Sequence, residues 1–141
     1  MSAMSASFTV APVRHAQAIR RSRKATGKVS VRRGVVAKAV EAGGVKAGSP
    51  KEVGENSDYV IVGVGFEPEV YACLTGDDGA LAGMSASGAI AVCSTASVSG
   101  VQDLARLCGE KGIGFLDAPI ARGRWAADEG TLLALVGGTP E

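Results

Sequence analysis

The polar residues that could bind a ligand follow three apolar stretches of the sequence. The run "DYVIVGV" is followed by Gly65 and Phe66, "GAIAVC" by Ser94 and Thr95, and "IGFL" by Asp117. Hydroxyl groups, a carboxylate and exposed glycine backbone are groups that orient a small ligand through hydrogen bonds. The sequence therefore predicts a binding site, provided that the fold brings the ends of these stretches together.

The sequence offers few residues for metal binding, nucleophilic catalysis or acid–base catalysis. The one histidine, His15, lies in the basic N-terminal part, which argues against a zinc site and a histidine-dependent triad in the rest of the chain. The three cysteines show no CxxC spacing and sit in apolar stretches, as buried small side chains do. Three lysines have helix or loop contexts away from the strand ends, so none is a candidate general acid or base. These are Lys46, Lys51 and Lys111. We therefore name no catalytic residue and no metal ligand.

Helical patterns alternate with the apolar stretches, and this order predicts how their ends are positioned. The three runs, and a further run "TLLALVGG", read as buried strands. Ser49 with Glu52, and Ser99 with Gln102, form capping boxes that open two of the intervening helices. Such an order predicts an α/β fold with a parallel sheet and helices on both faces. Ligands of such sheets bind at the carboxyl ends of the strands.

A glycine pair at the end of the first strand, Gly63 and Gly65, lies where a G-x-G-x-x-G fingerprint would sit. The third fingerprint position is Pro68, however, instead of glycine or alanine. The next strand, "AIAVCST", also ends without the acidic residue that would hold an adenosine ribose. We therefore interpret the two glycines as room for the close approach of a ligand or a helix.

Charge divides the chain into two regions. Nine of the 15 Lys and Arg residues precede the first acidic residue, Glu41. Residues 1–38 are therefore expected to form a disordered basic leader, an organellar transit peptide for the plastid or, as the alternative, the mitochondrion. A solvated tail and a nucleic-acid arm are other readings, but Phe8 is the one aromatic residue there that could stack on a base. No apolar run approaches the length of about 20 residues that crosses a bilayer. We expect neither a nucleic-acid partner nor membrane insertion.

The remaining residues, 39–141, contain blocks that resemble a known family. The block "FLDAPIARGRWAADEGTLLALVGG" follows "AVCSTASVSGVQDLARLCGEKG" and "NSDYVIVGVGFEPEVYACLTGDDGALAG". Together they are similar to the 3-hydroxyisobutyrate dehydrogenase family of β-hydroxyacid dehydrogenases. The resemblance implies part of a Rossmann-like NAD(P)-binding domain, with NAD or NADP as cofactor. It also implies a reversible hydride transfer between this cofactor and the hydroxyl carbon of a small 3-hydroxy acid.

The resemblance assigns roles to two groups of residues. In the family, the loop after the first predicted strand contacts the cofactor, and the Ser-Thr after the second, here Ser94 and Thr95, lies beside the nicotinamide side of the cleft. The implied cofactor-binding residues are Val64, Gly65, Glu69 and Thr95. A Ser-Gly-Gly loop after Asp-Ala-Pro binds the substrate carboxylate. The implied substrate-binding residues are Ala121, Arg122 and Gly123.

Several features depart from the family pattern. Ala121 lacks the serine hydroxyl, whereas Arg122 adds a guanidinium that could hold a carboxylate through two hydrogen bonds or be a solvated loop arginine. The family's first strand with its glycine-rich loop, its later proton-transferring lysine and its helical second domain have no counterpart here. If "GKVSVRR" is instead the family's second strand, Arg32 or Arg33 would favour NADP.

From these departures we expect an incomplete and inactive fragment of such an enzyme. The alternatives are a non-catalytic α/β binding or interaction module, and a fused or wrongly predicted gene. Uncovered sheet edges and an exposed apolar face would also favour a homo-oligomer.

Overall fold

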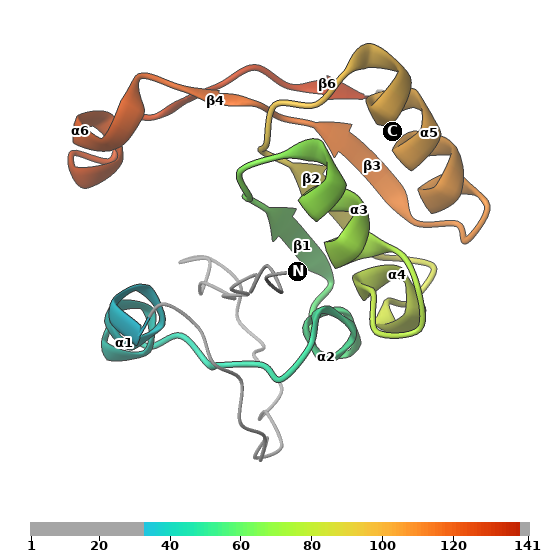
Figure 1. Cartoon of the computed structure of the whole chain (residues 1–141), viewed down its shortest axis with the longest axis horizontal. Helices are drawn as coiled ribbons and strands as arrows, with labels where there is room; N and C mark the ends of the chain where they lie inside the picture. The colour runs from blue at the N-terminus through green and yellow to red at the C-terminus, as the bar shows by residue number, and fades with distance from the viewer. Residues whose placement is uncertain (1–32, 139–141) are drawn as a thin grey trace, which may run out of the picture.

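A computed structural model describes residues 33–138, which form a four-stranded sheet with helices packed on it (Figure 1). Three strands are parallel and adjacent in the order of the sequence: β1 (Tyr59–Val62), β2 (Ala89–Val92) and β3 (Gly114–Asp117). A short fourth strand, β6 (Gly137–Gly138), pairs antiparallel with β3 at the edge of the sheet. The predicted Rossmann-like α/β sheet is therefore confirmed, with one antiparallel addition.

The register of β1 and β2 follows from their apolar side chains. Val60 lies beside Ile90, and Val62 beside Val92, in consecutive parallel pairs. All four side chains are buried, because alternate residues of a strand point to the same face of the sheet. A slip of one residue would expose all of them, so this pairing is strongly specified.

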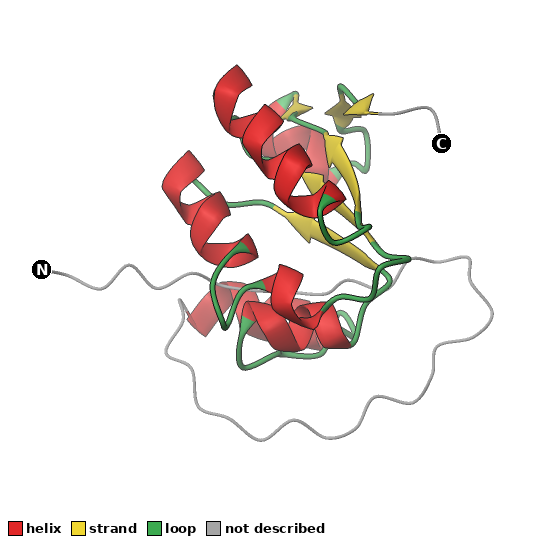
Figure 2. Ribbon diagram, turned by 90° about the vertical axis from the view of Figure 1, so that its right-hand side faces the viewer, coloured by secondary structure: helices red, strands yellow, loops and turns green. Residues whose placement is uncertain are grey.

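Two helices cover this buried face. They are α3 (Glu67–Leu74) and α5 (Val98–Gly109), which lie side by side on the same side of the sheet (Figure 2). Leu74 of α3 and Leu104 of α5 are fully buried in the resulting core. On the opposite face of β1, Tyr59 and Ile61 remain 76% and 69% exposed. Helices were predicted on both faces, but the described helices leave this second face of β1 open.

Two short helices close the amino ends of the strands. They are α2 (Pro50–Glu55) and α4 (Ala80–Gly83), which pack against each other. The Ser49 hydroxyl accepts a hydrogen bond from the Glu52 backbone N–H at 3.1 Å, which confirms the predicted N-cap. The Glu52 carboxylate does not complete the box at Ser49, because it accepts instead from the Gly48 N–H at 2.5 Å.

A long excursion leaves the sheet after β3, and we call residues 119–136 the arm. It contains β4 (Ile120–Ala121), α6 (Gly123–Asp128) and β5 (Leu133–Ala134), with β4 and β5 paired antiparallel. Figure 1 shows the arm extending away from the sheet. The segment "TLLALVGG" was predicted to be one strand, and this is wrong. It forms β5 in the arm and β6 in the sheet, because Leu133 and Ala134 pair with β4 whereas Gly137 and Gly138, after two intervening residues, pair with β3.

The first described element is α1 (Arg33–Glu41), which crosses the predicted boundary between residues 38 and 39. The rest of the predicted leader, residues 1–32, lies outside the described residues. Among the described helices, none has both the length and the apolar character that a bilayer crossing requires.

Candidate nucleotide-binding site

The carboxyl ends of β1, β2 and β3 meet at one edge of the sheet, as predicted for parallel strands. We call the loops that follow them, residues 63–66, 93–97 and 118–119, the carboxyl edge. Three predicted cofactor-binding residues belong to it: Val64 is half-buried, whereas Gly65 and Thr95 are exposed. Space is open around Gly63, where an added Cβ would meet nothing within 4 Å. The edge therefore offers accessible backbone and a hydroxyl to a ligand.

A buried serine connects the first two loops of this edge. Ser94 is 5% exposed, and its hydroxyl accepts a hydrogen bond from the Val64 N–H at 2.8 Å. The same hydroxyl donates to the Val64 carbonyl at 2.9 Å. One side chain thus satisfies both backbone polar groups of a residue on the neighbouring strand end.

Glu69, the fourth predicted cofactor-binding residue, is turned toward its own helix start. One of its carboxylate oxygens accepts from the Gly65 N–H at 2.8 Å and from the Phe66 N–H at 3.1 Å. These amides precede the first turn of α3, where backbone N–H groups lack helical partners. Glu69 therefore caps α3 and satisfies the amides that a bound phosphate would otherwise use.

A second glutamate does the same for α5. The Glu67 carboxylate accepts from the Ser97 N–H at 2.5 Å, and this hydrogen bond lowers the pKa of Glu67 below its ordinary value. The carboxylate packs directly over Gly100, where an added Cβ would lie 2.7 Å from its carboxyl carbon. Ser97 is also the N-cap of α5, since its hydroxyl accepts from the Gly100 N–H at 3.0 Å. The prediction of Ser99 as this cap is wrong, because the helix begins one residue earlier than that serine.

The two glutamates decide which part of a nucleotide fits here. Each helix N-terminus at the carboxyl edge already holds a carboxylate on its free N–H groups, Glu69 on α3 and Glu67 on α5. A pyrophosphate at either helix would have to displace a negative charge from a favourable position. The edge therefore fits the uncharged rings and hydroxyls of a dinucleotide, and its two helix starts do not fit the pyrophosphate.

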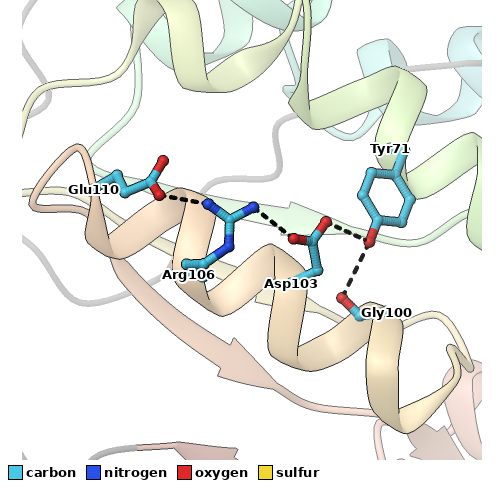
Figure 3. A network of polar contacts seen from close by, with 5 residues as sticks. All are labelled: Tyr71, Gly100, Asp103, Arg106 and Glu110. Carbon is cyan, nitrogen blue, oxygen red and sulfur yellow. Dashed lines mark hydrogen bonds and ion pairs between the residues drawn. The ribbon is translucent and has the colours of Figure 1, made fainter.

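A polar network fixes the packing of α3 against α5 (Figure 3). The Tyr71 hydroxyl donates to Asp103 at 3.0 Å and lies 3.4 Å from the Gly100 carbonyl. Arg106 donates to Asp103 at 2.6 Å and also to Glu110. The hydrogen bonds from Arg106 and Tyr71 lower the pKa of Asp103, so that it stays ionised and accepts both. This network holds α3, which carries both capping glutamates, against α5.

The predicted substrate-binding residues lie on the arm. Arg122 has a φ of 80°, in the left-handed region that disfavours residues with a side chain. Its guanidinium lies 5.1 Å from the Trp125 ring centre and donates to the Thr131 carbonyl at 3.2 Å. Ala121 and Gly123 line a shallow, mostly apolar pocket of about 230 Å³. In this arrangement the guanidinium is engaged within the arm rather than with the carboxyl edge.

Sequence reasoning missed the roles of Glu67, Ser97 and Tyr71. The hydrogen-bond partners of Glu67 and Tyr71 lie about thirty residues away in the sequence, so no local motif indicates them. For metal binding, the part of the chain that the structure describes contains no group of three or more His, Cys, Asp or Glu side chains placed to hold an ion.

A parallel α/β sheet with a ligand edge at its carboxyl ends defines the class of dinucleotide-binding domains. A family model described as the NAD binding domain of 6-phosphogluconate dehydrogenase matches residues 16–141. The chain belongs to this family of NAD-binding domains. The match begins inside the segment predicted to be a leader, and the leader itself stays a prediction.

Individual relatives agree with the family. A "Probable 3-hydroxyisobutyrate dehydrogenase-like 2, mitochondrial" of Arabidopsis thaliana is 38% identical over 100 residues, or 70% of this chain and 33% of the relative. A solved structure of 3-hydroxyisobutyrate dehydrogenase from Salmonella typhimurium matches with a TM-score of 0.68 and 26% identity, over 74% of this chain and 36% of that one. A structure of Psf3 with NADP+ and 2-OPP matches with a TM-score of 0.72 over 77% of this chain and 39% of that one. At 21% identity, this last match shows the fold alone.

These findings confirm the resemblance to the 3-hydroxyisobutyrate dehydrogenase family and its nicotinamide dinucleotide cofactor. The chain spans about a third of the length of the curated relatives that it matches. What matches is their cofactor-binding domain.

Proposed function

We propose that the chain provides the NAD(P)-binding part of an oxidoreductase of the 3-hydroxyisobutyrate dehydrogenase type. The reaction would be hydride transfer between the hydroxyl carbon of a small 3-hydroxy acid and NAD or NADP. The observation that carries this proposal is the carboxyl edge, where three parallel strands end together beside open backbone. The relatives named as dehydrogenases support the reaction type.

The residues of the carboxyl edge would have different roles in binding the cofactor. The cofactor supplies the hydride chemistry, by accepting or giving a hydride at its nicotinamide ring. Val64, Gly65 and Thr95 would contact the uncharged part of the cofactor through backbone and hydroxyl groups. Glu69 would act one step removed, because it holds the loop that carries Gly65.

Substrate binding is assigned to Ala121, Arg122 and Gly123. Arg122 could hold the substrate carboxylate with its planar guanidinium, once it leaves the Thr131 carbonyl. The alternative role is structural, since the same guanidinium already packs over the Trp125 ring within the arm. An intact homologue carrying this loop separates the two roles. Arg122→Ala should raise the KM for the hydroxy acid, and an unchanged KM would exclude anchoring by Arg122.

We further propose that the chain alone binds the cofactor without turnover. Among the described lysines, Lys51 lies on α2 and Lys111 follows α5, both at the opposite end of the sheet from the carboxyl edge. Neither of these two lysines is therefore placed to act as a general base for the substrate hydroxyl. Titration with NADH and NADPH, followed by nicotinamide fluorescence, should show saturable binding. Oxidation of NADPH by a 3-oxo acid in the same cuvette would contradict the lack of turnover.

A second candidate function is a non-catalytic interaction module. The observation that favours it is the run of exposed large apolar side chains on the arm, listed here: Ile120, Trp125, Leu132, Leu133, Leu135 and Val136. Such a surface favours association with another chain, including a second copy. The module predicts a stably folded chain that forms oligomers in sedimentation velocity and binds neither nucleotide. If the chain instead acts as a cofactor-binding domain, the same preparation should bind NADH or NADPH.

Import into an organelle is also proposed, with the plastid ahead of the mitochondrion. The basic composition of residues 1–38, without any carboxylate, supports this proposal. The Arabidopsis relative carries "mitochondrial" in its name, which favours the alternative. A fluorescent protein fused behind residues 1–38 distinguishes the two organelles, and diffuse fluorescence would contradict both.

A further inference from the structure

The loop after β1 is held at its second residue, Val64, by a side chain rather than by backbone pairing. The backbone ladder between β1 and β2 ends at Val62 and Val92, followed by one hydrogen bond from the Cys93 N–H to the Val62 carbonyl at 2.7 Å. In the same register, the partner of Val64 would be Ser94. The Ser94 hydroxyl takes over this position, by accepting from the N–H and donating to the carbonyl of Val64.

A side-chain hydroxyl in place of a backbone partner allows a different spacing between the two loops. A backbone pair would bring the chains to the usual distance of about 4.8 Å between strands. An inserted hydroxyl lets the two backbones separate while Val64 keeps both hydrogen bonds. Ser94 is only 5% exposed, so its hydroxyl is shielded from competing water. Removing it would leave two backbone groups unsatisfied in a half-buried place.

We propose that Ser94 is a positioning residue, which sets the distance between the loops after β1 and β2 and thereby the affinity for the cofactor. The inference rests on the proposed function, because it assigns the cofactor to the carboxyl edge. Ser94 itself lies beneath the edge, whereas its neighbours Gly65 and Thr95 are exposed on it. It acts on the cofactor through Val64 and the loop that follows.

The test uses the full 141-residue chain and three variants. Ser94→Ala removes both hydrogen bonds, and Ser94→Thr restores a hydroxyl. Thr75→Val is the matched control, since the Thr75 hydroxyl also donates to a backbone carbonyl, that of Tyr71 at 2.8 Å, but at the far end of α3. Each variant is measured by amide hydrogen exchange of residues 63–66 and by fluorescence titration with NADH and NADPH.

In Ser94→Ala we expect the Val64 amide hydrogen to exchange at least about tenfold faster. We also expect this variant to bind the cofactor about tenfold more weakly. Ser94→Thr should recover most of the amide protection and most of the cofactor affinity. Thr75→Val should change neither the exchange rate nor the affinity. Unchanged exchange at Val64 in Ser94→Ala would overturn the inference, as would faster exchange with unchanged affinity. If the unaltered chain binds neither nucleotide, the proposed function fails and the assigned effect on affinity with it. The exchange data would then still decide whether Ser94 holds the loop.

Discussion

The body of the molecule, residues 49–118, and the arm that follows it are built from the same kinds of residue but are stabilised differently. In the body, apolar side chains of β1, β2, α3 and α5 are buried against one another. In the arm, Ala126 is the one buried residue, and leucines and a tryptophan face outward. Apolar composition therefore predicts a buried segment only where a second layer covers it.

The largest expected effect is a loss of stability, and it tests the difference between the body and the arm directly. Leu104→Ala in the body removes a fully buried side chain and should lower the free energy of unfolding by about 2–5 kcal/mol. Leu133→Ala in the arm removes a side chain that is 48% exposed, and should change it by less than about 0.5 kcal/mol. Urea denaturation followed by far-UV circular dichroism measures both. Similar losses in the two variants would show that the arm is packed as tightly as the body.

Substitutions of two neighbouring arginines test the backbone conformation of the arm. Arg124 lies in the first turn of α6, so Arg124→Gly should destabilise the arm by about 1 kcal/mol. Arg122→Gly should stay within about 0.5 kcal/mol, because relief of its left-handed backbone offsets the lost contact with Trp125. Trp125 is the only tryptophan in the sequence, so its fluorescence reports on the arm during denaturation. Equal losses from both substitutions would contradict any strain at Arg122.

Within the body, the polar network between α3 and α5 should contribute less than the core. Tyr71→Phe removes the hydrogen bond to Asp103 and should cost about 0.5–1 kcal/mol, since the network is partly exposed. Tyr59→Phe is the control, because Tyr59 is 76% exposed on the open face of β1. Thermal melts of the two variants give the difference. A Tyr59→Phe loss as large as that of Tyr71→Phe would show that the network adds nothing specific.

The smallest expected effect is a change in pH dependence. The folded state lowers the pKa of Glu67 below its ordinary value of 4.5, so the ionised carboxylate stabilises the fold above that value. This contribution is lost as the pH falls through the lowered folded pKa. Glu67→Gln should therefore flatten the decline of stability between about pH 5 and pH 3. Melting temperatures across this range test it, with Glu110→Gln, at the exposed C-cap of α5, as the comparison variant. An unchanged pH profile in Glu67→Gln would contradict the assigned role.

The sequence predicted the elements of the body well, because their signals are local. Each parallel strand is a short apolar run bounded by turn residues, and Ser49 caps its helix from three residues away. The start of α5 was misplaced because three serines lie close together around it, at 94, 97 and 99, and any of them could cap a helix. Choosing among them requires the position of Glu67, which comes from another strand end.

The candidate site was predicted at the correct edge but without its internal contacts. Val62 pairs with Val92, Val64 with Ser94, and Glu67 with Ser97, and each pair is separated by 30 residues. This single offset is the register of β1 and β2, which depends on packing across the sheet and not on a local motif. Gly137 and Gly138 were predicted inside the single strand "TLLALVGG", and their antiparallel pairing with β3 was missed because it depends on contacts across the sheet.

The close packing of Glu67 on Gly100 has a consequence for how such sequences can change. A methyl group at position 100 would meet the carboxylate at 2.7 Å, so a side chain there requires a shorter residue at 67. The two positions should therefore covary across an alignment, with glycine at one accompanying glutamate at the other. A lineage that lost the glutamate would be free to place alanine on the helix, and at the same time would free the Ser97 N–H at the helix start for a phosphate.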